Sequence, residues 1–289
     1  MKRFLSWLRT IKFKKFLLWL FAVIITLSAV IYQRLTGPTY PKRVKVELDG
    51  KEYKLRLLRS SGGNDDAPIE LAIDEQFNAI LYYKYYPSVE NEVWKMVVFA
   101  KEGDKMVADL PNQPPAGKLM YYIEISTDKG IVPVQKDEPV VVRFKGAVPD
   151  FILLPHVFFM FFSMLLANVA GLFAIWKVDR YKRYTFLTLG SLTLGGMILG
   201  PVVQLYAFGE LWTGVPFGWD LTDNKTLIAF IFWLIAVLGN LKKDRRYLTI
   251  IAAVVILAIY SIPHSMFGSE LDRASGVVTQ GLIQFFHLL

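Results

Sequence analysis

The chain has 289 residues, of which 54% are hydrophobic and 20% are charged, and it contains no cysteine. The lack of cysteine excludes disulfides, thiolate metal sites and cysteine nucleophiles. The hydrophobic content is too high for an ordinary soluble globule, and the charged content is too high for a chain buried in lipid throughout. Composition therefore predicts a membrane protein with a substantial part in water.

Five blocks without Asp, Glu, Lys or Arg are the candidate membrane spans, and in chain order they cover residues 16–33, 151–176, 184–209, 226–241 and 247–269. About 20 apolar residues in a helix cross roughly 30 Å of hydrocarbon. We therefore predict five transmembrane helices, the first as an anchor and the other four as one module over residues 151–269. The block over residues 226–241 is the shortest, so its end residues must be drawn into the lipid interface.

The basic residues gather in the N-terminal segment 1–15 and in the loops "KVDRYKRY" and "NLKKDRRY". These segments hold 14 basic and 2 acidic residues, 14 − 2 = +12, which leaves −4 for the rest of a chain with net charge +8. By the positive-inside rule this pattern predicts a bacterial inner-membrane protein with a cytoplasmic N-terminus. Residues 34–150 and the tail 270–289 are then periplasmic. The basic excess is a topology signal with a minor role in holding anionic lipid, and no nucleic acid is expected as a partner.

The first block offers no good small-x-small cleavage site, so we expect it to remain as an anchor. After it, residues 34–150 alternate in the manner of strands. The run "RVKVELDGKEYKLRLL" predicts a hairpin that turns at Asp49-Gly50. Further predicted strands are "PIELAI", "AILYYKYY", "VWKMVVFA", "KMVADL", "KLMYYIEIS", "IVPV" and "PVVVRF". Short strands at this spacing indicate an all-β sandwich.

The run "LPNQPPAGKLMYYIEIS" resembles the part of immunoglobulin-like and fibronectin type III-like domains in which a Leu-Pro turn leads into a Tyr-bearing strand. The resemblance covers about a third of the chain. It implies a sandwich fold for the periplasmic domain and nothing about a ligand. Alternation places four side chains on the core face of that strand, namely Leu119, Tyr121, Ile123 and Ile125.

The aromatic run "LYYKYYP" sends Tyr83 and Tyr85 to one face of its strand and Tyr82 and Tyr86 to the other. One pair must therefore lie in water or contact a protein or glycan.

In the third span, Ser191-xxx-Gly195 and Gly196-xxx-Gly200 favour close helix packing. In the second span, polar and sulfur-bearing residues recur every four positions and are expected to face the bundle interior: His156, Met160, Met164 and Asn168.

Two Pro-His pairs mark the outer ends of the second and fifth spans, with His156 in "LLPHVFFMF" and His264 in "SIPHSMFGS". Several possible ligands are expected at the same depth: Met160, Met266, Asp220, Asp223 and Glu270. In a purely structural role, each histidine would be an interfacial residue hydrogen-bonded to a neighbour. As a cofactor site, His156 and His264 would ligate haem b, or would bind copper or zinc with these methionines or carboxylates.

Two further hypotheses use the same residues. In a metal-assisted enzyme at the outer membrane face, a histidine would act as general base and an aspartate would orient it or hold a divalent ion. In a proton or ion path, histidine and carboxylates would relay charge. The chain has no nucleophile elbow, His-Glu-x-x-His or Walker signature. We therefore favour a non-enzymatic accessory or scaffold subunit of an envelope complex, held by membrane lipid and bound to a protein partner.

The segment "GVPFGWDLTDNKT" places charge directly before the fourth span. Thr222 or Asp223 is the expected N-cap of that helix. Asp220 then has no evident structural role, and we expect its loop to fold over the bundle mouth towards His156 and His264. The tail "GVVTQGLIQFFHLL" is too short to span and is expected to lie in the interface, with no role assigned to His287.

Overall fold

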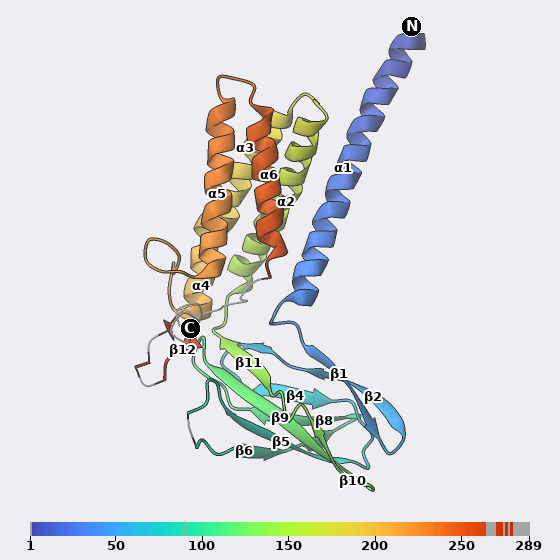
Figure 1. Cartoon of the computed structure of the whole chain (residues 1–289), viewed down its shortest axis with the longest axis vertical. Coiled ribbons are helices and arrows are strands. Elements are labelled where there is room, and N and C mark those ends of the chain that lie inside the picture. The colour runs from blue at the N-terminus through green and yellow to red at the C-terminus, as the bar shows by residue number, and fades with distance from the viewer. Residues whose placement is uncertain (1, 90, 264–269, 274, 277, 280–289) are drawn as a thin grey trace. The chain divides into compact units, whose positions relative to one another are not determined.

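The computed structural model describes residues 2–89, 91–263, 270–273, 275–276 and 278–279, with side chains described for residue 10 and from residue 12 to residue 278. The chain forms two compact units (Figure 1). The helical unit comprises Met1–Gly37, Val148–Leu205 and Glu210–Met266, and the β-unit comprises Pro38–Ala147, Tyr206–Gly209 and Phe267–Leu289.

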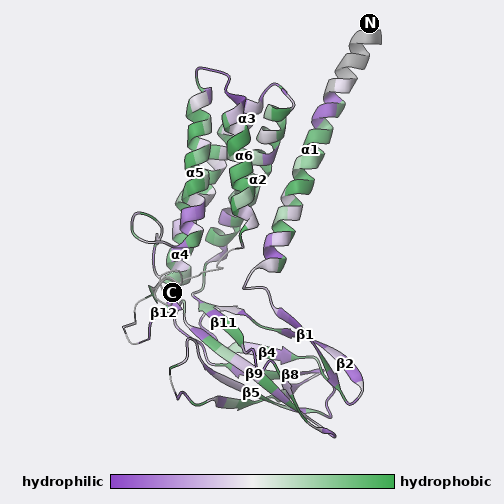
Figure 2. Cartoon of the chain, in the orientation of Figure 1, coloured by the Kyte–Doolittle hydropathy of each residue, from purple (hydrophilic) through white to green (hydrophobic). Residues whose placement is uncertain are grey.

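The helical unit contains the α-helices α1 (Lys2–Thr36), α2 (Asp150–Ile175), α3 (Tyr181–Leu192), α5 (Leu221–Asn240) and α6 (Arg246–Ser261). It also contains α4 (Gly200–Phe208) as far as Leu205. A π-helix, η1 (Thr193–Leu199), joins α3 to α4. Hydrophobic residues cover the helices, whereas hydrophilic residues gather near their ends and on the strands (Figure 2). Within the described residues, four helical stretches are long and apolar enough to cross a membrane: Lys12–Thr36, Asp150–Ile175, Tyr181–Phe208 and Leu221–Asn240.

The fifth predicted span does not continue as a helix to its predicted end. Helix α6 has 16 residues, about 24 Å of helix at 1.5 Å per residue, and it ends at Ser261. Ile262 follows with an extended backbone, because the ring of Pro263 disfavours helical geometry in the residue before it. The prediction of a helix through residues 262 and 263 was therefore wrong, and residues 264–269 lie outside the described residues.

Small residues allow the helices of this unit to approach closely, as the glycine pattern predicts. A Cβ added at Gly195 would lie 2.9 Å from Cβ of Phe159 in α2. A Cβ at Gly196 would lie 2.7 Å from Cγ2 of Thr226 in α5. Next to these contacts Trp233 is fully buried in a core formed with Met164, Leu192, Ala236, Ala252 and Ile256.

Leucine at position 196 is expected to destabilise the helical unit by about 1–3 kcal/mol, because the side chain would be forced into α5. Gly190 is the matched control, since a Cβ there meets nothing within 4 Å. Thermal unfolding in mild detergent should show a lower melting temperature for Gly196→Leu but not for Gly190→Leu. Equal melting temperatures would show that the α5 contact is not tight.

The β-unit contains two larger sheets and the antiparallel hairpin β1 (Lys42–Leu48) and β2 (Lys51–Leu57). One sheet has the order β3-β11-β9-β5-β6, and its strands span β3 (Ser60–Gly62), β11 (Val140–Lys145), β9 (Lys118–Thr127), β5 (Asn78–Tyr85) and β6 (Lys95–Val98). Strand β10 (Gly130–Val134) also pairs with β9. The other sheet joins β4 (Ala67–Leu71), β8 (Lys105–Leu110) and β7 (Ala100–Glu102). A two-stranded ladder pairs β12 (Glu270–Leu271) with β13 (Val278–Thr279).

The alternation that predicted the strands also predicts the core. The four predicted core residues of β9, Leu119, Tyr121, Ile123 and Ile125, are all fully buried. They pack with apolar residues of both larger sheets and of the β1–β2 hairpin. The hairpin turns at Asp49-Gly50 as predicted, with both residues in the left-handed region at φ 47° and 88°. A local period of two residues was therefore sufficient to identify the faces of these strands.

Asp74 connects the hairpin to the segment after β4, and it is expected to make the β-unit sensitive to acid. Lys51 Nζ lies 2.8 Å from Asp74 Oδ2, and the Tyr53 hydroxyl also donates to this carboxylate. The hydrogen bond from Lys51, followed by that from Tyr53, lowers the pKa of Asp74 below its ordinary value of 3.8. A lowered native pKa stabilises the fold above the unfolded value, and this stabilisation is lost as the pH falls through the native value.

Hydrogen exchange of hairpin amides should therefore speed up in the wild type as the pH falls below 3.8, after correction for intrinsic exchange rates. Asp74→Asn should remove most of this pH dependence, and Asp65→Asn, at an exposed aspartate, should retain it. An unchanged pH profile for Asp74→Asn would contradict this assignment.

Candidate functional site

His156 lies in the second turn of α2 and contacts the π-helix. Its Nδ1 lies 2.9 Å from the carbonyl oxygen of Gly195, which also accepts the backbone N–H of Gly200. A carbonyl can only accept, so Nδ1 carries a proton. In the neutral ring Nε2 is then left with its lone pair. The π-helix thus determines which ring nitrogen of His156 can bind another group.

The prediction that one stripe of α2 faces the bundle interior is confirmed for the last two of its four residues. Met164 and Asn168 are buried, and Asn168 Nδ2 donates to Thr26 Oγ1 in α1 at 2.9 Å. Met160 is half-buried, and its sulfur accepts from the hydroxyl of Tyr260 at 3.9 Å. The stripe therefore joins α2 to α1 and α6, and Met160 already has a protein partner.

Asp220 is the N-cap of α5, which corrects the prediction that Thr222 or Asp223 has this role. Its Oδ1 accepts the backbone N–H groups of Thr222 at 2.8 Å and Asp223 at 3.1 Å. The prediction was wrong because the helix begins at Leu221, ahead of the uncharged block that suggested its start. Asp220 therefore has a structural role, as an N-cap, that the sequence analysis did not predict.

Asp223 holds the preceding loop against the start of α5. Its Oδ2 accepts from the backbone N–H of Thr213 at 2.7 Å and from the Thr213 hydroxyl at 3.2 Å. Gln204 Nε2 donates to the same hydroxyl at 2.6 Å. Both aspartates thus satisfy backbone donors, which is a structural use of their charge.

Lys225 is the charged residue of this region that sequence reasoning missed as a site. It lies one turn into α5 with only 5% of its surface exposed. Its Nζ donates to the carbonyl oxygens of Ile262 at 3.0 Å and Pro263 at 3.3 Å. Among the described residues no carboxylate lies within 4.0 Å of this nitrogen, although the charge of Asp220 acts on it at longer range. A buried ammonium in an apolar helix is a functional candidate by default.

A small internal space lies beside Lys225, and the centre of a water molecule can occupy about 10 Å³ of it. It is lined in part by Gln33, Tyr260 and Thr226. Nε2 of Gln33 is buried without a hydrogen-bond partner within the described part of the chain. The volume suits about one water molecule.

The remaining predicted ligands are distributed as follows. Glu270 belongs to the β-unit, where its Oε1 lies 3.4 Å from Nζ of Lys118, and burial lowers the pKa of Lys118. His264, Met266 and His287 lie outside the described residues. Within the described ranges, no three His, Asp or Glu side chains come together in an arrangement that could hold a metal ion. The predicted site residues of the helical unit that the structure describes are therefore Asp220 and Asp223 at the start of α5, and His156 and Met160 on α2.

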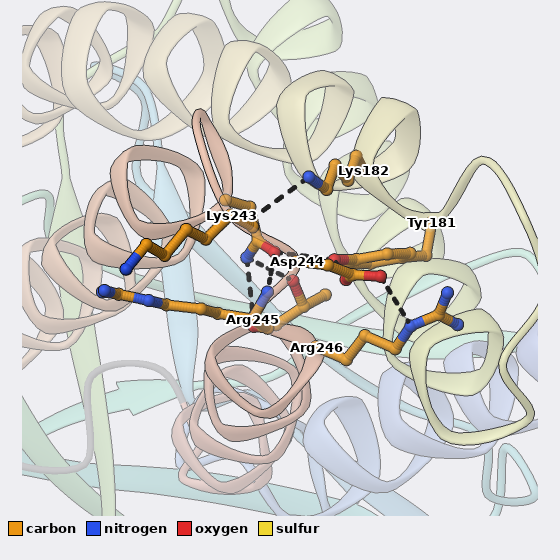
Figure 3. Close-up of polar contacts among 8 residues, drawn as sticks. Tyr181, Lys182, Lys243, Asp244, Arg245 and Arg246 are labelled. Atoms are coloured by element: carbon orange, nitrogen blue, oxygen red, sulfur yellow. Dashed lines mark hydrogen bonds and ion pairs between the residues drawn. The ribbon is translucent and has the colours of Figure 1, made fainter.

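A second polar cluster, also missed by sequence reasoning, lies where the α2–α3 and α5–α6 loops meet (Figure 3). Oδ1 of Asn240 accepts from the Tyr181 hydroxyl at 2.7 Å and from the backbone N–H of Arg245 at 2.8 Å. Asp244 shares the single proton of this hydroxyl with Asn240, and Asp244 also pairs with Arg246 Nε at 3.3 Å. An asparagine near the end of an apolar block was the only sequence signal for this cluster.

The β-unit exposes an apolar surface at the edge of its larger sheet, which we name the β6 surface: Tyr82, Trp94, Met96 and Val98. Met96 and Val98 are 68% and 67% exposed. Tyr82 stacks on Tyr122 with ring centroids 4.9 Å apart, and Trp94 meets the edge of Tyr122 at 4.8 Å. Strand β6 pairs with β5 on one side and ends the sheet on the other.

Cations frame the β6 surface. Lys84 Nζ lies 4.7 Å from the Trp94 ring centroid, and Lys95 Nζ lies 5.0 Å from that of Tyr85. Neither lysine has a carboxylate within 4.0 Å among the described residues. Next to them a groove of about 460 Å³ runs along Tyr85, Pro87, Val89, Glu92, Val93 and Arg273. The sequence predicted that one of two tyrosine pairs lies in water or contacts a partner. Only Tyr86 of the four is exposed, and Tyr82, Tyr83 and Tyr85 are half-buried.

Comparison of the chain with protein-family models, curated proteins and solved structures finds no match.

Proposed function

We propose that this is an inner-membrane protein with five transmembrane helices, α6 being the fifth, and with its basic loops in the cytoplasm. The charge pattern supports this topology, since the loops at one end of the helical unit are basic. The other end exposes aromatic residues of the kind that occupy the lipid interface, Phe217 and Trp219. Helix α6 is short for a span, and local thinning of the bilayer accommodates such helices.

The β-unit is proposed to be a periplasmic immunoglobulin-like sandwich. The order β11-β9-β5-β6 corresponds to strands G-F-C-C′ of that fold, and the pairing of β4 with β8 corresponds to B with E. Tyr121 differs from the usual tyrosine corner, because its hydroxyl bonds to the distant carbonyl of Leu58 at 3.0 Å.

The function that the geometry supports best is that of an accessory subunit, in which the helical unit anchors the chain and the β-unit binds a partner protein. The observation that carries this proposal is the outer edge of β6, which pairs with no further strand among the described residues and bears exposed apolar side chains. An edge strand offers unpaired backbone groups to a further strand. The partner is therefore proposed to add an extended segment along β6.

The residues on and around β6 indicate which side chains the partner segment should have. The exposed Met96 and Val98 suit apolar side chains at alternate positions. Lys84 and Lys95 lie at the rim and suit carboxylates. A strand with alternating apolar residues and acidic flanks is complementary to both.

The test is co-purification from native membranes in mild detergent. Val98→Lys should abolish recovery of the partner, because a cation would be buried in the apolar contact. Ile131→Lys is the matched control, since Ile131 is 65% exposed on β10. Loss of the partner with Val98→Lys alone supports the proposal. Retention with Val98→Lys, or equal loss with both variants, contradicts it.

A second candidate function is a metal or haem protein that uses His156, and one specific observation favours it. The carbonyl of Gly195 holds Nδ1 of His156 and leaves Nε2 as the free acceptor, the arrangement found in metal-ligating histidines. Haem b, copper or zinc would then need His264 or another donor.

Absorption spectra of the oxidised and reduced protein, together with metal analysis by mass spectrometry, test this candidate. A Soret band or a stoichiometric metal that His156→Ala removes would support it, whereas a colourless and metal-free preparation would exclude it. His156→Ala should leave partner recovery intact if only the accessory function is correct.

A further inference from the structure

The α2–α3 and α5–α6 loops lie at the same end of the helical unit (Figure 1), and both are strongly basic in sequence. Residues 177–183 and 242–246 together hold eight basic residues and two aspartates, 8 − 2 = +6. Lys14 of α1 joins them, because its Nζ donates to the carbonyl oxygen of Trp176 at 3.3 Å. Three separate segments of the chain therefore bring positive charge to one end of this unit.

Hydrogen bonds of Asn240, Tyr181 and Lys182 hold the loops that carry these cations, and we name this set of contacts the polar frame. Asn240 bonds to both the N–H and the carbonyl of Arg245, at 2.8 and 3.2 Å. Tyr181 of α3 donates to Asn240, and Lys182 Nζ donates to the carbonyl of Lys243 at 3.3 Å. The positions of Lys243 and Arg245 are thus determined by contacts between two loops, and their side chains extend to the same side (Figure 3).

The acidic residues do not neutralise this cluster. Asp244 is engaged by the Tyr181 hydroxyl and by Arg246, whose guanidinium also lies 4.8 Å from the Tyr181 ring centroid. The hydrogen bond from Tyr181 lowers the pKa of Asp244. Among the described residues no carboxylate lies within 4.0 Å of the charged groups of Lys182, Lys243 or Arg245. Their charge is therefore available to an external anion.

Large apolar side chains lie next to these cations. Trp176 and Tyr247, each adjacent in sequence to a basic residue of the loops, are 47% and 57% exposed. Leu241 and Ile175 are also more than a third exposed. A soluble phosphate would satisfy the cations but leave these surfaces in water. A lipid satisfies both, since its headgroup meets the cations and its acyl chains meet the aromatic and aliphatic side chains.

We propose that the two loops form a binding site for an anionic phospholipid, in which Lys243 and Arg245 contact the headgroup phosphate and Trp176 and Tyr247 contact the acyl chains. Tyr181 and Asn240 are positioning residues, because they act by holding the α5–α6 loop. The site rests on the proposed membrane location of the helical unit and is independent of partner binding at β6.

The test uses the full chain in an uncharged detergent and adds phosphatidylglycerol, phosphatidylcholine with the same acyl chains, or glycerol phosphate. Phosphatidylglycerol should raise the melting temperature of the wild type, and the other two should not. Native mass spectrometry should show roughly thirtyfold weaker binding of phosphatidylglycerol to the double variant Lys243→Gln/Arg245→Gln, from the usual contribution of two cations near an anionic surface.

Two controls separate a site from general attraction of charge. Lys54→Gln/Lys129→Gln changes the net charge equally at exposed lysines of the β-unit and should bind as the wild type does. Tyr181→Phe keeps the net charge and should still weaken binding, because it releases the frame. Equal shifts with phosphatidylcholine or glycerol phosphate, or equal losses in both double variants, would overturn the proposal. Partner recovery should be unaffected in Lys243→Gln/Arg245→Gln, which distinguishes this site from the β6 surface.

Discussion

Replacing Lys225 by alanine is expected to lower the free energy of unfolding of the helical unit by about 2–4 kcal/mol. The ammonium is the hydrogen-bond donor to the carbonyl oxygens of Ile262 and Pro263, which follow the end of α6. Without it these acceptors lose their donor in a region with little water, and the buried stem of Lys225 leaves a cavity. Thermal unfolding in mild detergent measures the change.

Two further variants show which part of Lys225 is responsible. Methionine retains most of the apolar stem but has no charge, so Lys225→Met isolates the contribution of the ammonium. Lys242→Ala removes an exposed lysine just after the same helix and should change stability by less than about 0.5 kcal/mol. If Lys225→Met is as stable as the wild type, the carbonyl contacts do not hold α5 to the end of α6.

The second large effect is expected for Asn240→Ala, with a loss of about 2–4 kcal/mol. Asn240 is 1% exposed, and its amide bonds to Tyr181, to both backbone groups of Arg245 and to the carbonyl of Ala236. Its removal leaves several buried groups without partners and releases the α5–α6 loop. Unfolding in detergent, together with hydrogen exchange of residues 241–246, should show lower stability and faster exchange.

The volume of the side chain is controlled with leucine. Asn240→Leu fills nearly the same space but forms no hydrogen bond. It should be as destabilising as alanine if the polar contacts dominate, because it buries the same unpartnered groups. Recovery of wild-type stability by leucine would show that packing, and not the polar frame, holds the two loops.

The strands and their core faces were predictable because the relevant pattern is local. In β9 every second residue is buried from Leu119 to Ile125, and the Asp49-Gly50 turn is encoded by the two residues that adopt it. The long apolar helices were predictable for a similar reason, since the length of an uncharged run is visible in the chain itself.

The site was less predictable, as three residues show. The role of Asp220 depended on where α5 begins, and that start lies within a charged segment that hydropathy excludes. Lys225 was not identified as a site residue, because its partners follow α6, more than 30 positions later in the chain. Asn240 was hidden in an apolar block, and its importance depends on Tyr181 at the start of another helix, α3.

Short-range patterns in this chain are therefore enough to specify its membrane-compatible helices, its basic loops and the alternating strands of its β-unit. They could not specify the partners of His156, Asp223, Lys225 and Asn240, because each partner is brought close by packing between separate segments. Hydropathy and periodicity record whether a residue is buried, whereas hydrogen bonding depends on which atoms then lie within about 3 Å. For this protein that second kind of information came only from the folded chain.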